Sequence, residues 1–421
     1  MTPHPHPTHL ANVSHVLGAS QPSLTKQTRP VPAKNGLQRL PIIVVAALLL
    51  ASCASRPPPP TAPAAVQPPV VAAPAGTISP TAPRPIAITT PPGQGKSRWI
   101  PVAWSDLPGF EADSLHEAWN AWLKNCERPN TVFAPLCADV RRLSIATGEE
   151  QRAWMTARLQ PFRIESQLGV VDGQLTSYYE PVFKASRKPG NGFEVPLYRA
   201  PATLASRRPW YTRQEIDTLP EARQALKGRE IAWIADPIDM MMLHIQGSGR
   251  LSFDDLSAPE RPIRVAFAGT NEQPYRSINQ WLLEQGVTKI NPWPDATKAW
   301  ALQNPQRVPQ LLWSNPRFVF FKEEALTDFD AAFGPRGAQG VPLTPGRSIA
   351  VDPASIPYGT PVWLASRGPA VQLQKLVFAQ DTGSAIVGAV RADYFAGTGF
   401  EAGVLAAKVN QPLRLWALWP K

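Results

Sequence analysis

The chain has 421 residues, 49 of them proline, with a formal net charge of +10 at pH 7. Its length allows two or three domains. It contains no Cys-x-x-Cys, His-Glu-x-x-His or Gly-x-Ser-x-Gly motif and no phosphate-binding glycine loop, which argues against a zinc site, a Ser-His-Asp triad and a nucleotide site.

The first part of the chain predicts export from the cytoplasm. Lys34 and Arg39 precede the apolar residues 41–50, a run too short to span a bilayer permanently, as in a signal peptide. The run ends in Leu50-Ala-Ser-Cys53, which resembles the bacterial lipobox, where the cysteine is lipidated and becomes the new N-terminus. A plain signal peptide with a chance cysteine is the alternative. Residues 1–52 are therefore expected to be a leader.

Two further features refine this expectation. Residue 54 is Ala rather than Asp, which by resemblance to sorted bacterial lipoproteins favours the outer membrane. Because residues 1–33 are polar and unusually long for a charged leader, we expect the translation start near Gly36 or Leu37. The basic charges are scattered, so a solvated basic surface, or one facing anionic wall polymer or lipid head groups, is favoured over nucleic acid. We expect a periplasmic protein held by a lipid on the outer membrane.

Residues 56–95 consist almost entirely of Pro, Ala, Thr and Val. Such a segment cannot bury a core and favours extended polyproline II, so residues 53–97 are expected to be the lipidated cysteine and a semi-rigid tether. About 325 residues remain, enough for a sizeable core. In an oxidising compartment Cys126 and Cys137 are expected to form a disulfide, with two buried free thiols as the alternative.

Three segments predict helices. Residues 113–126 place apolar side chains at helical spacing behind a capping box of Ser114 and Glu117, and their Trp119 and Trp122 are expected in the core. Residues 150–162 predict a second helix. A third, over residues 274–286, ends at a glycine.

Strands are expected over most of the remaining chain. The segment 170–182 and the alternating or buried runs 229–235 and 316–322 predict strands, and shorter ones follow, separated by Gly and Pro turns, at 348–351, 361–364, 376–379 and 413–418. Many short strands with few helices favour a β-barrel or sandwich in the C-terminal part.

Three aspartates lie at the ends of these C-terminal strands or in turns: Asp352, Asp381 and Asp393. Asp is depleted within strands, so the three suggest carboxylates gathered by a compact β fold. Carboxylates held in a cleft suit acid-catalysed cleavage of a glycoside. The alternative is that each only caps a turn through its own backbone.

A second candidate segment is Asp239-Met-Met-Met-Leu-His-Ile-Gln-Gly-Ser-Gly249. We expect a strand that ends in Gln246-Gly247-Ser248, whose backbone and side chains suit hydrogen bonds to sugar hydroxyls. His244 is expected to be a core residue rather than a catalyst.

At this point six motifs make the chain recognisable. It resembles the membrane-bound lytic murein transglycosylase A (MltA) family through, in order, Thr176-Ser-Tyr-Tyr-Glu-Pro181, Ile245-Gln-Gly-Ser-Gly249, Tyr275-Arg-Ser-Ile278, Asn315-Pro-Arg-Phe-Val-Phe-Phe-Lys322, Ile356-Pro-Tyr-Gly-Thr360 and Gln380-Asp-Thr-Gly-Ser-Ala-Ile386. The resemblance spans roughly residues 98–419. Ser384 stands where the family usually has a second Gly, and Glu180 occupies a position that varies in the family.

The resemblance implies a mainly β fold with a few helices: a double-psi β-barrel domain with an inserted second β domain. The barrel domain would comprise residues 98–182 and 323–421, with the three-aspartate 3D domain at about 345–421. Residues 183–322 would form the inserted glycan-binding domain. A groove between the two would hold the glycan strand.

The resemblance also implies the site. Asp393 would be the single general acid/base and Asp381 its supporting carboxylate, with Thr176 and Tyr178 near the acid. Gln246, Gly247 and Ser248 would contact the glycan, and Asp352 would be structural. No metal or cofactor is implied, and neither is a nucleic-acid partner.

The implied enzyme is a peptidoglycan lytic exotransglycosylase, a carbon-oxygen lyase acting on a polysaccharide. It would cleave the β-1,4 bond between N-acetylmuramic acid and N-acetylglucosamine and form 1,6-anhydromuramic acid ends during cell wall turnover. The alternatives are an inverting glycoside hydrolase of the same fold and a non-catalytic wall-binding lipoprotein.

Overall fold

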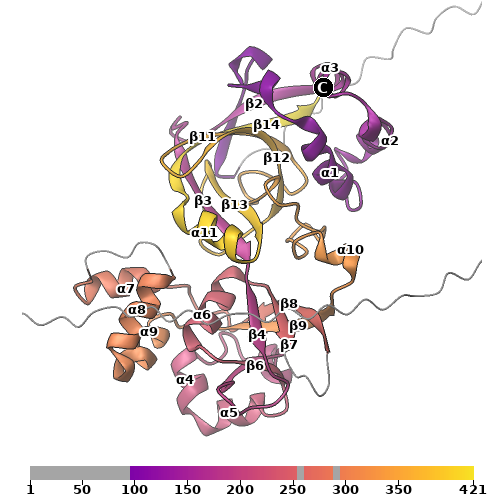
Figure 1. The fold of residues 1–421 in the computed structure, drawn as a ribbon. Coiled ribbons are helices and arrows are strands. Elements are labelled where there is room, and N and C mark those ends of the chain that lie inside the picture. The colour runs from indigo at the N-terminus through magenta and orange to yellow at the C-terminus, as the bar shows by residue number, and fades with distance from the viewer. Residues whose placement is uncertain (1–94, 254–259, 288–293) are drawn as a thin grey trace, which may run out of the picture. The chain divides into compact units, whose positions relative to one another are not determined.

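The computed structural model describes residues 95–253, 260–287 and 294–421, and their strands form three sheets (Figure 1). The expected leader, Cys53 and residues 53–94 of the expected tether lie outside these ranges. No helix in the described ranges combines the length and apolar character needed to cross a membrane. The structure confirms the expectation of a fold that is mainly sheet and also contains helices.

The largest sheet has eight strands in the order β1-β2-β14-β11-β12-β10-β13-β3. Its strands are β1 Ser97–Pro101, β2 Leu159–Ser166, β3 Gly173–Glu180, β10 Ser348–Val351, β11 Pro361–Arg367, β12 Gln372–Asp381, β13 Arg391–Thr398 and β14 Asn410–Pro420. Because β14 also pairs with β3, six of these strands form a closed ring of pairings. The sheet thus joins two separated stretches of chain, and its double-psi topology stays a prediction.

Two smaller sheets are built from the chain between these stretches. The four-stranded sheet has the order β4-β7-β8-β9 and the other is a pair. Their strands are β4 Val182–Ala185, β7 Gly249–Phe253, β8 Glu260–Thr270, β9 Val319–Ala325, β5 Val195–Tyr198 and β6 Glu230–Ile234. Strand β3 continues into β4 through Pro181 alone (Figure 1). The last residue of β3 therefore lies where the two larger sheets meet along the chain.

The described ranges contain more helices than expected, eleven of α type. They are α1 Leu115–Asn125, α2 Cys137–Arg142, α3 Gly148–Arg158, α4 Arg213–Thr218, α5 Pro220–Leu226, α6 Pro237–Gln246, α7 Ile278–Glu284, α8 Asp295–Gln303, α9 Val308–Trp313, α10 Asp328–Ala331 and α11 Phe400–Lys408. The three expected helices are present as α1, α3 and α7. However, α3 ends at Arg158, so residues 159–162, expected to be helical, belong to β2.

The prediction that a strand leads into Gln246 is wrong, because this segment is helix α6. Asp236 accepts a hydrogen bond from the Ile238 amide at the N-terminus, and Pro237 stands in the first turn. A short run of consecutive apolar residues fits a buried strand and a buried helix equally well. Six of its side chains, Ile238 and Met240 to His244, are buried, so the run reflects burial rather than a strand.

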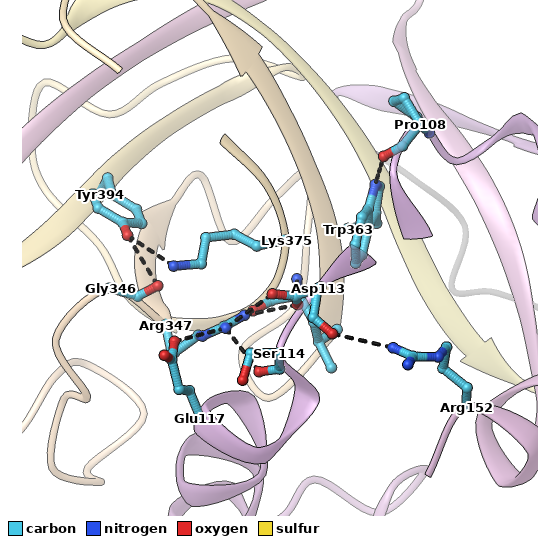
Figure 2. A network of polar contacts seen from close by, with 11 residues as sticks. Pro108, Asp113, Ser114, Glu117, Arg152, Gly346, Arg347, Trp363, Lys375 and Tyr394 are labelled. Carbon is cyan, nitrogen blue, oxygen red and sulfur yellow. Dashed lines mark hydrogen bonds and ion pairs between the residues drawn. The ribbon is translucent and has the colours of Figure 1, made fainter. Parts of the chain in front are cut away.

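The expected capping box of α1 is also wrong, because Ser114 makes no side-chain cap. Glu117 instead accepts a hydrogen bond from Arg347 over 2.9 Å, and Asp113 binds the same guanidinium with both oxygens at 2.8 and 2.9 Å (Figure 2). The Asp113 carboxylate also accepts from the Leu376 amide of β12. A buried arginine requires such charged partners, so this network ties the start of α1 to the large sheet.

The core of the α1 region is aromatic. Trp119 and Trp122 are each 1% exposed, which confirms their expected place in the core, and Trp122 packs against Phe378 of β12 at 5.5 Å between ring centroids. Cys126 and Cys137 form a disulfide that links the end of α1 to the first residue of α2.

Candidate active site

Strand β13 carries Asp393 between two paired neighbours. Asp393 lies opposite Thr176 of β3 on one side and Ala350 of β10 on the other. Ala350 in turn lies opposite Asp381 of β12. Directly paired residues project from the same face of a sheet, so the two carboxylates lie on either side of Ala350 on one face.

Two hydroxyl donors from β3 lie beside these carboxylates, and together the four side chains, Thr176, Tyr178, Asp381 and Asp393, form a row across the sheet that we call the site row. Thr176 and Tyr178 are two residues apart and therefore share one face of the strand. The Thr176 hydroxyl donates to Asp393 Oδ1 over 2.5 Å, and the Tyr178 hydroxyl donates to Asp381 Oδ2 over 2.8 Å. All four side chains remain partly exposed. Each carboxylate thus has its own donor, and the group as a whole is half-buried.

The surroundings of Asp393 favour its protonated form. Burial raises the pKa of this carboxyl to about 6, and the neighbouring Asp381 charge adds to the increase. The Thr176 hydrogen bond and the Arg391 charge oppose the rise without cancelling it. A carboxyl with such a pKa holds a proton in mildly acidic solution and can exchange it near neutrality.

Asp381 is held more firmly than Asp393. Its Oδ1 accepts hydrogen bonds from the backbone amides of Ala338 and Thr382, each over 2.9 Å. Burial raises the pKa of Asp381, and these amides together with Tyr178 offset part of the rise. Gly337 permits the loop to approach, because a Cβ there would lie 2.4 Å from the Gln380 carbonyl oxygen. Three donors fix this carboxyl in place, and its supporting role stays a prediction.

The opposite face of β13 is anchored next to the acid. Tyr394 donates to the Gly346 carbonyl over 3.0 Å, and Lys375 donates to the Tyr394 hydroxyl over 3.5 Å (Figure 2). Since successive side chains alternate across a strand, Tyr394 fixes β13 from behind while Asp393 projects forward. The network around Arg347 therefore supports the strand that carries the acid.

The Gln246-Gly247-Ser248 segment reaches the same strand from α6. The Gln246 side-chain oxygen accepts a hydrogen bond from the Tyr179 amide over 3.0 Å. Gly247 ends the helix with a φ of 81°, a conformation that favours glycine, and Ser248 is buried. The segment is thus joined to β3 one residue beyond Tyr178. Its contact with a glycan stays a prediction.

The third aspartate lies in a different environment. Asp352 is 5% exposed, forms an ion pair with Lys96 at 2.9 Å and accepts the amides of Gly388 and Ala354. Burial alone would raise its pKa, but these hydrogen bonds and the Lys96 charge bring the pKa below its usual value. Asp352 therefore stays ionised and connects a strand end to two loops, which is a structural arrangement.

His244 is a buried core residue, as expected. Its Nδ1 lies 2.8 Å from Arg213 Nη2, and its ring packs against Phe318. Burial, aided by the Arg213 charge, brings the pKa of His244 well below its usual value, so the ring is neutral. This residue supports the sheet of β9 rather than any chemistry.

Sequence reasoning missed two members of the site. Arg391 donates to the Thr176 hydroxyl over 2.7 Å, and Ala338 supplies a backbone amide to Asp381. Arg391 could have been found, because it stands two residues before Asp393 and so shares its face of the strand. Ala338 could not, since it binds through its backbone from a loop with no motif.

The arrangement suits proton transfer by one carboxyl beside a second, fixed carboxyl. No group of three or more His, Cys, Asp or Glu side chains able to hold a metal ion occurs in the described residues. The chemistry that the described side chains themselves offer is general acid and base catalysis, with Asp393 as the group that titrates.

Comparisons with known proteins match two parts of the chain to family models. The MltA specific insert domain matches residues 174–322, and the 3D domain matches residues 347–419. The first range includes Thr176, Tyr178 and Gln246, and the second includes all three aspartates of the C-terminal part.

Relatives and solved structures agree with these matches. The membrane-bound lytic murein transglycosylase A of Vibrio cholerae is 32% identical over 304 residues, which cover 68% of this chain and 76% of the relative. The structure of the lytic transglycosylase LtgG of Burkholderia pseudomallei is 42% identical, with a TM-score of 0.55 over 79% of this chain and 98% of the other. The structure of Escherichia coli MltA with bound chitohexaose is 25% identical, with a TM-score of 0.62 over 79% of this chain and 96% of the other.

Proposed function

Since this chain belongs to the membrane-bound lytic murein transglycosylase A family, whose members are peptidoglycan-cleaving lyases, we propose which bond it cleaves and how. The substrate bond is the β-1,4 linkage between N-acetylmuramic acid and N-acetylglucosamine. The product carries a 1,6-anhydromuramic acid end, and a single aspartate, Asp393, acts as acid and then as base. Chitohexaose, bound by the Escherichia coli protein, is a β-1,4 glycan of the corresponding kind.

The observation that carries this proposal is the position of Asp393, which lies on one sheet face with the fixed Asp381 and in surroundings that raise its pKa to about 6. Protonated Asp393 donates its proton to the glycosidic oxygen as that bond breaks and positive charge develops at C1. The resulting carboxylate then takes the proton of the muramoyl C6 hydroxyl, whose oxygen bonds to C1 and closes the anhydro ring. Asp393 is ionised only between these two steps, and the C6 proton returns it to the protonated form in which it began.

A second catalytic carboxylate is not needed, because the substrate supplies its own nucleophile. Asp381 instead acts as a fixed neighbour whose negative charge raises the pKa of Asp393. A glycan that covers the partly exposed row would exclude water and favour the protonated form further. Thr176 and Tyr178 hold the two carboxyls in this geometry.

The wider organisation follows from the same reasoning. Residues 98–182 and 323–421 would form the catalytic domain, a double-psi β-barrel, and residues 183–322 an inserted domain that presents Gln246, Gly247 and Ser248 to the glycan. The division of strands between the large sheet and the two smaller ones supports this assignment. Lipidation of Cys53 and the proline-rich tether would hold the enzyme on the periplasmic side of the outer membrane.

Digestion of purified murein by the wild type and by Asp393→Asn tests the proposal. We expect the wild type to release anhydromuropeptides, each lighter by one water than the product of hydrolysis, and Asp393→Asn to release almost nothing while unfolding at a similar or higher temperature. Reducing-end saccharides would indicate a hydrolase, and an active Asp393→Asn would remove this residue from its role.

A further inference from the structure

The Arg391 side chain of β13 hydrogen-bonds the hydroxyl of Thr176 on β3, the same hydroxyl that binds Asp393. We propose that Arg391 is a positioning residue that acts through Thr176 to decide which oxygen of Asp393 carries the catalytic proton. The inference rests on the proposed acid role of Asp393 and concerns the orientation of that acid rather than its identity.

A chain of two hydrogen bonds joins the three side chains. Arg391 Nη2 donates to Thr176 Oγ1 over 2.7 Å, and Thr176 Oγ1 donates to Asp393 Oδ1 over 2.5 Å. A guanidinium can only donate, whereas a hydroxyl has a single hydrogen and two lone pairs. Arg391 therefore occupies a lone pair of Thr176 and leaves its hydrogen to point at Asp393.

This direction has a consequence for the protonated acid. Asp393 Oδ1 must accept from Thr176, so a proton on Oδ1 would compete with the Thr176 hydrogen for the same contact. The proton is accordingly placed on Oδ2. If Arg391 were removed, the Thr176 hydroxyl could turn and accept a hydrogen from Oδ1, and the acid proton would be divided between the two oxygens.

Arg391 is itself held in position. Its Nη1 donates to the carbonyls of Ala392 and Gln174, on the two strands that meet at the site, and the side chain is partly buried. Such backbone contacts fix the guanidinium before any substrate binds.

The charged and titratable groups around Asp393 come from three strands. Strand β13 contributes Arg391, β12 contributes Asp381 and β3 contributes Tyr178, while the β10 neighbour is the uncharged Ala350. Arg391 opposes the rise in the pKa of Asp393, and Asp381 promotes it. Removal of the Arg391 charge must therefore extend the protonated form of Asp393 to higher pH.

The test compares Arg391→Met, Arg391→Lys and Thr176→Val with the wild type on soluble, uncrosslinked glycan strands, with kcat and KM measured across pH. For Arg391→Met we expect a fall in kcat of about tenfold, in line with the loss of a charge-assisted hydrogen bond, and little change in KM. The alkaline limb of the pH profile of kcat should move to higher pH by roughly half a unit or more in Arg391→Met, because the charge that favours ionised Asp393 is gone. Arg391→Lys keeps the charge and should leave the limb near its wild-type position.

Thr176→Val provides an independent measurement should Arg391→Met fold poorly, because it removes the same donor from Oδ1. Alone it should lower kcat and move the alkaline limb of the pH profile to higher pH. Adding Arg391→Met to Thr176→Val should then lower kcat by far less than the roughly tenfold fall expected when Arg391→Met is made in the wild type. If Arg391→Met lowered kcat without moving the alkaline limb of the pH profile, the role of Arg391 would be purely structural. The same would follow if Arg391→Met lowered kcat as much in the Thr176→Val background as in the wild type. Asp393→Asn in the same assay separates the two claims: if it is active the proposed function fails, and if it is inactive only the role of Arg391 is at stake.

Discussion

Tyr178 donates its hydroxyl hydrogen to Asp381 Oδ2 over 2.8 Å. Burial, reinforced by the Asp381 charge and this hydrogen bond, raises the pKa of Tyr178 well above its usual value, so the phenol stays neutral and remains a donor. Its ring packs against Phe395 of β13, with 5.3 Å between the ring centroids. The tyrosine thus links Asp381 to the strand that carries Asp393.

Tyr178→Phe should therefore impair catalysis more than folding. The change removes one of three donors to Asp381, so the pKa of Asp381 should rise and its charge should no longer be fixed beside Asp393. A hydrogen bond to a charged group contributes about 1.5–3 kcal/mol, which corresponds to roughly a 10- to 100-fold loss of kcat. The rate of murein solubilisation and the thermal unfolding temperature should be measured together.

Tyr179→Phe is the matched control, since Tyr179 lies on the other face of the same strand. Its hydroxyl contacts the Met242 sulfur and neither carboxyl of the site. We expect near wild-type rates. An equal loss in both variants would mean that the tyrosines act on β3 as a whole rather than on Asp381.

The sequence predicted the parts of this molecule in which a local pattern has one structural meaning. The short apolar segment at residues 348–351 is followed by a proline turn, and strand β10 has the bounds that were predicted. Trp119 and Trp122 follow a helical spacing and are buried. The four side chains of the site row were identified through family motifs, and their hydrogen bonds could not be predicted, because strand register depends on contacts between distant segments.

The predictions failed where two interactions compete for one residue. Glu117 fits a capping box by spacing, but the buried Arg347, 230 positions away, binds it instead. The apolar run before Gln246 fits a buried strand and a buried helix equally well, and the Asp236 cap with Pro237 in the first turn favours the helix. For Glu117 the deciding partner lies far away in the sequence, whereas for α6 the deciding signal is the helix start before the apolar run.

The raised pKa of Asp393 predicts that the acid destabilises the folded state. Its pKa is about 6 in the folded chain against 3.8 when unperturbed, so stability is fully present below about pH 4 and is lost as the pH rises through 6. Asp393→Asn should therefore stabilise the protein by up to about 3 kcal/mol above pH 6 and have little effect at pH 4. Denaturant unfolding at a series of pH values measures this difference.

Asp352→Asn should show the opposite sign. The pKa of Asp352 is lowered in the folded chain, so its contribution to stability is present above the unperturbed value of 3.8 and is lost as the pH falls through the folded pKa. The variant should be less stable than the wild type at neutral pH, with a difference that shrinks in acid. If both asparagine variants changed stability in the same direction, the opposite environments of the two aspartates would be refuted.

Glu180 offers a test of what joins the large sheet to the four-stranded sheet. Its fully buried carboxylate accepts hydrogen bonds from Arg264 of β8 and Arg250 of β7. The Thr398 hydroxyl of β13 also donates to it, over 2.8 Å. Both arginines further donate to the Phe333 carbonyl. One carboxylate therefore pairs with two guanidinium groups and connects strands of both sheets.

Glu180→Gln keeps the shape of this side chain but removes the carboxylate that pairs with the buried Arg264 and the half-buried Arg250. We therefore expect a loss of roughly 3–5 kcal/mol in the free energy of unfolding. The control is Asp172→Asn, which removes one partner of the exposed Arg414–Asp172 pair and should change stability by less than about 1 kcal/mol. Denaturant unfolding of both variants at pH 7 makes the comparison. Equal, small changes would show that the Glu180 network contributes no more than a surface ion pair. A large loss confined to Glu180→Gln would establish that the carboxylate next to Pro181 holds the two sheets together.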